Sequence, residues 1–216
     1  LYPIYPFKTQ EEQQQFIDHF HPANLLSRHP KARPLISAPQ LASLQSMVQR
    51  YIQAMKLSPD IIIQEGVMCA WMKQNADDPK SEDPKGVEMV PAIAYCNYLD
   101  GKIINVKFRS VQQHPVTGEW SKLFCQVSPT KPCAPYGIDS INLLRPDAQP
   151  IRQLIITEGE KDRLTLMTCG FPYVLSIANG ASTNIEESHE AFDEWIQQAG
   201  EIIICGDTDR PGRRLV

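Results

Sequence analysis

Three short apolar runs constrain the fold of the last third of this 216-residue chain. They are residues 153–157 (QLIIT), 173–177 (YVLSI) and 201–205 (EIIIC), and each has the length of a buried strand. Helical segments separate them, one ending at Gly170 and the next at Gly200, and a third begins within the closing PGRRLV. This alternation predicts a doubly wound parallel sheet. The run 201–205 lacks polar alternation, so we expect it to be buried on both faces.

Acidic residues follow two of these runs. Glu158 comes directly after the first run, and Asp207 and Asp209 come just after the third. Right-handed crossovers bring the carboxyl ends of parallel strands to the same edge, where Gly180 in SIANGAS allows close backbone approach. Three neighbouring carboxylates repel one another and raise each other's pKa unless a cation joins them. The sequence therefore predicts a site for Mg²⁺, with Mn²⁺ as the alternative, that leaves coordination positions for phosphate and water.

Charge is unevenly distributed along the chain, whose formal net charge is −4. Residues 102–131 hold five basic side chains and one acidic one, whereas the chain from Ile151 onward holds eleven acidic and six basic side chains. A basic segment joined to an acidic one is typical of a polyanion site with metal-holding carboxylates. Two solvated faces of opposite charge explain the pattern equally well. Arg210, Arg213 and Arg214, beside the paired aspartates, are suited to phosphate oxygens.

The chain divides into three segments by composition. Residues 1–75 are expected to be mainly helical, with a long helix over 37–56 and a short one after it. Residues 76–150 are expected to form a basic, mixed β subdomain with a hairpin turn at Asp100-Gly101 and a further strand in SKLFCQVS. Residues 151–216 carry the predicted parallel sheet.

The six cysteines form no CxxC pair, so we expect no zinc site here and assign the thiols to reduced core positions. Cys125 and Cys133 alone are close enough in sequence to consider as a pair. The longest apolar runs are too short to cross a bilayer and no charged-then-apolar leader opens the chain, so we expect a cytoplasmic protein without a membrane partner. A chain that starts at Leu1 and stops at Val216 is expected to be a fragment of a larger polypeptide.

The motifs of the last segment resemble the Toprim domain of DnaG-type primases, type IA and type II topoisomerases and some nucleases. LIITEGEKDRLTLMTCGFPYVLSIANGAS followed by IIICGDTDRPGRR is similar to the corresponding stretch of phage primase-helicases and of the mitochondrial Twinkle type. Asp162 also matches the primase pattern EGxxD. The resemblance implies an α/β fold with a Toprim-type, Rossmann-like parallel sheet, truncated at its C-terminal end and preceded by a mixed α+β basic subdomain.

The same resemblance implies an activity. This is Mg²⁺-dependent nucleotidyl transfer that makes RNA primers from ribonucleoside triphosphates on a single-stranded DNA template, with a replicative helicase in cis or in trans. Glu158, Asp207 and Asp209 would be the catalytic residues and metal ligands, and Asp162 would support them as a further ligand. The alternatives are a Toprim-family metal-dependent nuclease and a non-catalytic DNA-binding module. The residues that would contact nucleotide or DNA are Lys107, Arg109, Lys122, Arg210, Arg213 and Gly180.

Two departures from the family pattern bear on activity. Primases of this type usually carry an upstream zinc-binding module, and this chain has no such cysteine set. Family members also have a further strand and a second acidic pair beyond the position of Val216, so we expect weak metal binding and little activity from this chain alone.

The implied setting is the cytoplasm of a bacterium, or a phage or mobile element. Asp162 has an alternative role in stabilising a helix dipole, and we expect Glu160 at the surface.

Overall fold

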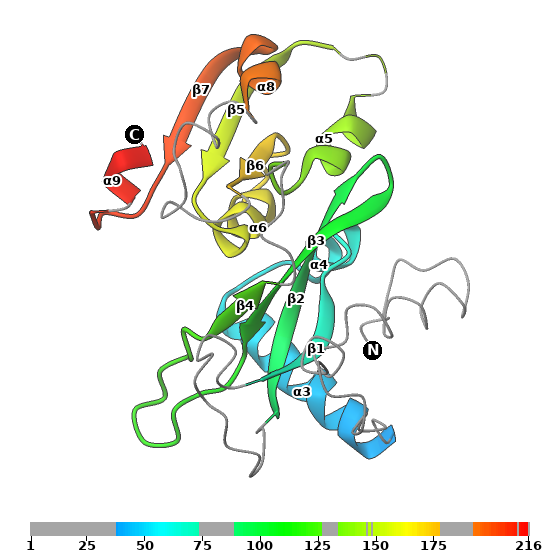
Figure 1. Cartoon of the computed structure of the whole chain (residues 1–216), viewed down its shortest axis with the longest axis vertical. Helices are drawn as coiled ribbons and strands as arrows, with labels where there is room; N and C mark the ends of the chain where they lie inside the picture. Colours follow the sequence, from blue (N-terminus) through cyan, green and yellow to red (C-terminus); the bar gives the residue numbers. More distant parts are fainter. Residues whose placement is uncertain are drawn as a thin grey trace. The chain divides into compact units, whose positions relative to one another are not determined.

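The computed structural model describes residues 38–73, 89–126, 134–145, 147, 149–177, 192–210 and 212–215. Gly180, Cys133 and the predicted helical content of residues 1–37 lie outside the described residues. The described elements, in chain order, are α3 (Ala38–Ala54), α4 (Pro59–Gln64), β1 (Met68–Lys73), β2 (Met89–Leu99), β3 (Lys102–Ser110), β4 (Phe124–Gln126), α5 (Ile138–Leu144), β5 (Ile151–Thr157), α6 (Glu160–Thr168), β6 (Val174–Ser176), α8 (Asp193–Gln197), β7 (Ala199–Cys205) and α9 (Gly212–Leu215) (Figure 1).

The described residues fall into two compact units. The first takes those within Leu1–Cys96 and Val106–Val127, and we call it the antiparallel unit. The second takes those within Asn97–Asn105 and Ser128–Val216, and we call it the parallel unit. The predicted division into segments 1–75, 76–150 and 151–216 stays a prediction.

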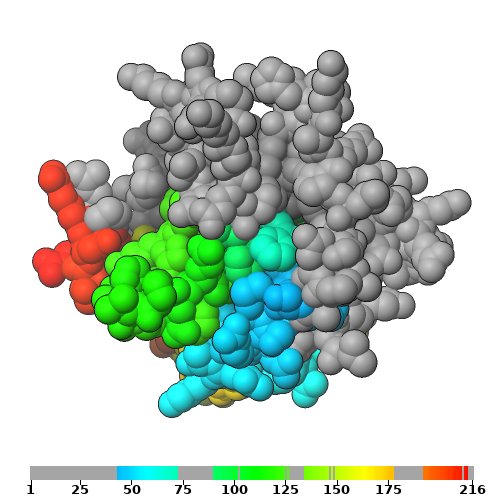
Figure 2. All heavy atoms as spheres, turned by 90° about the horizontal axis from the view of Figure 1, so that it is seen from below, coloured from blue at the N-terminus to red at the C-terminus, as the bar shows by residue number. Residues whose placement is uncertain are grey.

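The antiparallel unit is built on a four-stranded sheet in the order β1-β2-β3-β4. The predicted helix over 37–56 is confirmed as α3, and it packs against β1. Leu44, Val48, Tyr51 and Ile52 recur at helical spacing and are at most 2% exposed, so they form the face of α3 that enters the core. Figure 2 shows atoms of α3, in blue, beside green atoms of the part of the chain that carries β2, β3 and β4.

Strand β1 departs from the prediction of a mainly helical N-terminal segment. Residues 68–73 pair with β2 in antiparallel register, with Met68 opposite Ala94 and Lys73 opposite Met89. Short segments such as MCAWMK form strands when a neighbouring strand supplies the hydrogen bonds and the packing, so local periodicity does not reveal them. The short helix predicted after the first one is confirmed as α4, with Pro59 at its first position.

The predicted hairpin between β2 and β3 is confirmed. Asp100 and Gly101 have φ values of 53° and 73°, the positive backbone angles of a tight hairpin turn. Their backbone N–H groups donate to the two carboxylate oxygens of Asp139 at 3.0 and 2.7 Å. Helix α5, which the sequence did not predict, therefore holds the turn of the hairpin within the parallel unit.

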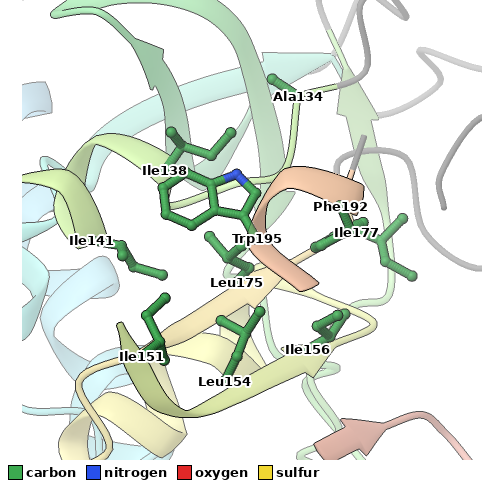
Figure 3. Close-up of a cluster of buried hydrophobic side chains, with 10 residues drawn as sticks. All are labelled: Ala134, Ile138, Ile141, Ile151, Leu154, Ile156, Leu175, Ile177, Phe192 and Trp195. Atoms are coloured by element: carbon green, nitrogen blue, oxygen red, sulfur yellow. The ribbon is translucent and has the colours of Figure 1, made fainter. Parts of the chain in front are cut away.

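The parallel unit confirms the predicted sheet. Strand β5 lies between β6 and β7 and is parallel to both. Helix α6 contacts β5 and β6. Figure 3 shows a second set of contacts, in which Trp195 from α8 lies among side chains of α5 and of the strands. This hydrophobic cluster comprises Ala134, Ile138, Ile141, Ile151, Leu154, Ile156, Leu175, Ile177, Phe192 and Trp195.

Three details of this sheet correct the predictions. Strand β7 is not buried on both faces, because Ile202 and Ile204 are 37% and 38% exposed. Its one strand partner among the described residues is β5, so its outer edge has no described strand neighbour. The second predicted helix does not end at Gly200: α8 ends at Gln197, and Gly200 lies in β7, where it approaches the carbonyl of Arg152.

The cysteines do not all occupy the core. Cys96 is buried and Cys69 is half-buried, whereas Cys169 and Cys205 are exposed free thiols, which corrects the assignment of the cysteines to core positions. Burial raises the pKa of the Cys69 thiol to about 11 and raises that of Cys96 as well.

None of the helices in the described ranges has the length and apolar character needed to span a bilayer.

Candidate functional site

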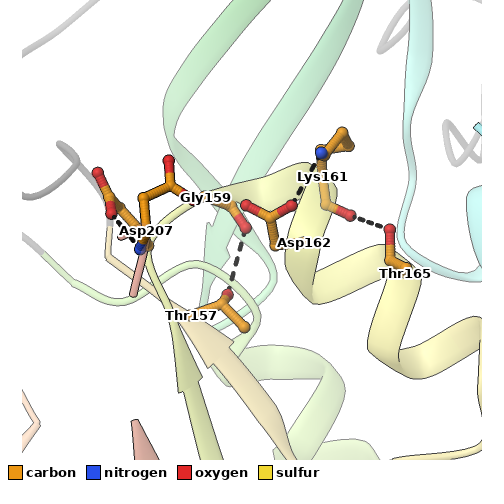
Figure 4. Close-up of polar contacts among 7 residues, drawn as sticks. Thr157, Gly159, Lys161, Asp162, Thr165 and Asp207 are labelled. Atoms are coloured by element: carbon orange, nitrogen blue, oxygen red, sulfur yellow. Dashed lines mark hydrogen bonds and ion pairs between the residues drawn. The ribbon is translucent and has the colours of Figure 1, made fainter. Parts of the chain in front are cut away.

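The candidate site lies at the carboxyl ends of two neighbouring parallel strands. Thr157, the last residue of β5, is paired with Cys205, the last residue of β7. The Glu158 carboxylate accepts a hydrogen bond from the backbone N–H of Asp207, with 3.1 Å between Oε2 and N (Figure 4). The sheet register therefore brings together two acidic motifs that are 49 residues apart in the chain.

The loop after β7 owes its shape to two glycines. A Cβ atom on Gly206 would lie 2.6 Å from the carbonyl oxygen of Gly212, and a Cβ atom on Gly212 would lie 2.6 Å from the backbone nitrogen of Asp207. Real Cβ atoms do not approach backbone atoms so closely. The backbone at Gly206 and Asp207 packs closely against that of Gly212, which explains why the paired aspartates are bracketed by glycines.

Asp209 closes this loop. Its Oδ1 atom accepts the N–H of Gly212 at 2.9 Å, and its carbonyl oxygen accepts the N–H of Arg213 at 3.1 Å. This is the geometry of a helix cap at the start of α9. One oxygen of Asp209 is therefore used locally, while the Asp207 side chain is exposed and accepts no hydrogen bond from the described residues.

The arginines of this loop differ in their contacts. The Nε–H of Arg213 donates to the carbonyl oxygen of Thr208 at 2.7 Å, which fixes the base of the guanidinium beside the loop. Its terminal N–H groups belong to an exposed side chain and can still donate to an anion. Arg210 is exposed as well.

The first turn of α6 separates two acidic residues by environment. Glu160 is 4% exposed, so its predicted surface position is wrong: the turn that starts α6 points this side chain into the unit. Asp162 lies on the same turn, is 44% exposed, and forms an ion pair with Lys161 at 3.0 Å. An acid in the first turn also stabilises the helix dipole, which is the alternative role of Asp162.

Arg163 is a buried residue that the sequence interpretation missed. Its guanidinium Nε donates to the carbonyl oxygen of Val174 at 2.7 Å, and its Cζ atom lies 5.1 Å from the ring centroid of Tyr136. Gly137, with φ 104°, packs against the guanidinium where a Cβ atom would clash. Tyr136 and Ser176 also exchange two backbone hydrogen bonds. Arg163 thus ties the segment before α5 to β6, and its helical spacing from buried Met167 was the available signal.

The structure brings together two of the four residues predicted to bind Mg²⁺. Carboxylate oxygens are the donors that a hard divalent cation prefers, and Glu158 and Asp207 lie side by side. Within the described ranges, no three or more His, Cys, Asp or Glu side chains form a group that could hold a metal ion. The set Glu158, Asp207, Asp209 and Asp162 therefore stays a prediction, and so does the role of Gly180.

Three of the predicted nucleic-acid contacts, Lys107, Arg109 and Lys122, belong to the antiparallel unit. Lys107 and Arg109 lie two residues apart on β3 and so project from the same face of the sheet. Lys122 is exposed and precedes β4. The Lys107 Nζ atom lies over the ring of Phe124, 5.6 Å from its centroid. The role of these three cations in binding stays a prediction.

Comparison with known sequences places the chain near primases. No protein-family model matches it. It is 27% identical over 136 residues to the primase homolog protein of Arabidopsis thaliana, which covers 57% of this chain and 35% of the relative. It is 26% identical over 143 residues to the chloroplastic/mitochondrial Twinkle homolog protein of the same plant, which covers 60% of this chain and 18% of the relative. The chain thus spans well under two thirds of either relative.

Solved structures of primase cores share the fold. The primase fragment of the bacteriophage T7 primase-helicase protein is 24% identical with a TM-score of 0.53, covering 76% of this chain and 56% of that one. The DnaG catalytic core is 16% identical with a TM-score of 0.56, covering 96% and 64%. The DnaG catalytic domain bound to single-stranded DNA is 15% identical with a TM-score of 0.53, covering 95% and 65%. The fold is therefore that of a primase catalytic core with a Toprim-type parallel sheet, and the predicted resemblance of this chain to primases and Twinkle is confirmed.

Proposed function

We propose that this chain is part of a DNA primase and that the carboxyl edge of its parallel sheet is the nucleotidyl-transfer site. The observation that carries the proposal is the contact between the Glu158 carboxylate and the backbone of Asp207, which joins the two acidic motifs. The sequence similarity to a primase homolog and the fold of a primase core support the same conclusion.

The acidic residues would hold the metal ion that phosphoryl transfer needs. Mg²⁺ bound by Glu158, Asp207 and Asp209 would neutralise the charge on the phosphates of an incoming nucleotide. Asp207 and Asp209 project from a loop whose backbone is held by glycine contacts and by a helix cap, so their positions are set before a ligand arrives. Glu158 would serve as a ligand or as a general base, and Asp162 would support the set.

The basic residues would hold the polyanionic substrates. Arg210 and Arg213 are exposed on the loop that carries the aspartates, where their guanidinium groups suit phosphate oxygens. Lys107, Arg109 and Lys122 would bind the backbone of the template or the triphosphate of a nucleotide. Each phosphate contact would add to the salt dependence of binding.

The substrates and partners are proposed from the same comparisons. A DnaG catalytic domain has been solved bound to single-stranded DNA, which supports a single-stranded DNA template here. The similarity to a primase-helicase and to a Twinkle homolog supports a replicative helicase as partner, in cis or in trans. Ribonucleoside triphosphates would be the monomers that the site joins.

Primer synthesis by the full-length protein that contains this chain tests the proposal. We expect Glu158→Gln and Asp207→Asn to lower Mg²⁺-dependent incorporation of labelled ribonucleotides on single-stranded DNA by at least about 100-fold, because each removes a charge that phosphoryl transfer requires. Glu201→Gln is the matched control. Glu201 is an exposed carboxylate on β7 that contacts Gln153, and its loss is expected to change the rate less than about twofold.

Two results would overturn the proposal. One is undiminished primer synthesis by either site variant, with the variants folded as judged by circular dichroism. The other is metal-dependent cleavage of labelled DNA without incorporation of nucleotides, since the same carboxylates would then serve a nuclease.

A further inference from the structure

Phe124 is an exposed aromatic side chain in a basic setting. It opens the short strand β4 and is 50% exposed. A single exposed apolar residue needs no special explanation, so the side chains around it decide whether it has a role. Three of the predicted nucleic-acid contacts lie close to it along or across the strands: Lys107, Arg109 and Lys122.

The register of β3 and β4 fixes the face from which the ring projects. Phe124 is directly opposite Arg109, and Cys125 is directly opposite Phe108. Opposed residues of an antiparallel pair project to the same side, and successive residues alternate. Phe108 is 1% exposed and lies in the core, so Phe124 and Arg109 project from the other face of the sheet.

One cation lies over the ring, and two others are near it across the strand pair or along the chain. The Lys107 ammonium lies 5.6 Å from the ring centroid, and Lys107 shares the face of Arg109. Lys122 is exposed two residues before Phe124 in the chain. Residues 106–126, which belong to the same unit as Phe124, hold three basic side chains against one acidic one, although the whole chain carries a net charge of −4. A flat apolar surface within a local positive field suits a ligand that is aromatic and anionic at once.

We infer that Phe124 is a stacking residue for an unpaired base of single-stranded DNA, whose flanking phosphates contact Lys107, Arg109 and Lys122. A base–aromatic stack with basic residues along the backbone is how proteins bind single strands without reading sequence. This inference rests on the proposed function, because it assigns the template strand to the antiparallel unit. It adds a residue that motif and charge patterns did not mark.

The test is a binding measurement with a single-stranded oligodeoxynucleotide that carries 2-aminopurine, whose fluorescence falls when the base stacks. The full-length protein is titrated without metal or nucleotides, so binding is separated from catalysis. Phe124→Ala is expected to weaken binding about tenfold and to abolish the quench at that base. Phe124→Trp is expected to keep both the affinity and the quench of the unmodified protein. Phe124→Leu, which keeps apolar bulk without a π face, behaves like the alanine variant.

Salt dependence separates stacking from charge. The slope of log K against log salt concentration is unchanged in Phe124→Ala, because no phosphate contact is lost. Lys107→Gln lowers the slope by about 0.7, the value for one phosphate contact on a single strand. Because Phe124 is half exposed, its replacement leaves little unfilled space, and thermal unfolding of each variant checks that the fold is kept.

Three outcomes would overturn this inference. The first is that Phe124→Ala binds the DNA as tightly as the unmodified protein. The second is that Phe124→Leu gives the same affinity and the same quench as Phe124→Trp. The third is that loss of the ring weakens binding only of RNA of the same sequence or of free ATP. Each is independent of the proposed function. A protein that primes normally and shows no stacking at Phe124 contradicts the inference alone, while one that stacks the base but does not prime contradicts the proposed function alone.

Discussion

Strands β5 and β7 carry similar apolar runs but lie in different environments. Leu154, Ile155 and Ile156 on β5 are at most 5% exposed, whereas Ile202 and Ile204 on β7 are 37% and 38% exposed. β5 pairs on both sides, while β7 pairs only with β5 within the described part of the chain. An apolar run makes burial favourable, but neighbouring strands and helices decide whether the burial occurs.

The largest expected difference between the strands is in stability. Leu154→Ala removes a fully buried side chain from the hydrophobic cluster, and we expect it to lower the free energy of unfolding by about 3 kcal/mol. Urea unfolding of the purified protein measures this value. A loss below about 1 kcal/mol would mean that the cluster in Figure 3 does not hold the sheet together in solution.

The glycines that follow β5 and β7 differ in how tightly their surroundings are packed. Gly206→Ala, after β7, places a Cβ atom 2.6 Å from the carbonyl oxygen of Gly212, so the loop carrying the aspartates must shift. Gly159→Ala, after β5, meets only the end of the Asp162 side chain, at 3.3 Å. We expect Gly206→Ala to lower primer synthesis at least about tenfold, since small displacements of catalytic groups are costly.

Gly159→Ala is the control for that loop, with an expected rate change below about threefold, because the contact requires the Asp162 side chain to shift by only a few tenths of an ångström. Equal effects of the two substitutions on the rate would contradict the view that the loop after β7 is the more tightly constrained. Unfolding curves of both variants separate a local shift from a global loss of structure.

A smaller effect is expected from Ile204→Ala. More than a third of this side chain is exposed, so its truncation removes less buried area than a core substitution does. We expect the free energy of unfolding to fall by less than about 1 kcal/mol, measured by the same urea titration. A loss comparable to that of Leu154→Ala would show that β7 is covered in solution by part of the protein, or by a partner, on its exposed face.

Ionisation of the Cys69 thiol makes the free energy of unfolding depend on pH above pH 9.0, but not at neutral pH. Burial raises the pKa of Cys69 from 9.0 to about 11, so the folded thiol stays neutral after the unfolded one has ionised. The stability that neutral burial provides is full below pH 9.0 and is lost as the pH rises from 9.0 towards 11. Unfolding between pH 8 and 11 measures the loss, which Cys69→Ala should reduce. An identical pH dependence in that variant would rule out the thiol as its cause.

Much of the parallel unit could be predicted because its signals are local. Apolar runs of strand length, the glycine at Gly170 and the acids at the strand ends all occur within a few residues of the elements they mark. The contact between Glu158 and Asp207 was predictable from topology, since parallel strands end at one edge. Glu160 and Arg163 were not, because their burial depends on how α6 faces the sheet.

The sequence by itself determined the order of strands and helices in the last segment, the hairpin turn at Asp100-Gly101 and the acidic motifs, since periodicity and turn chemistry act over short stretches of chain. The tertiary structure alone decided that β7 is exposed, that residues 68–73 form a strand, and that Asp209 spends one oxygen on a helix cap. Burial, strand pairing and the use of a carboxylate oxygen depend on atoms that come from distant parts of the chain, and only the folded molecule brings those atoms together.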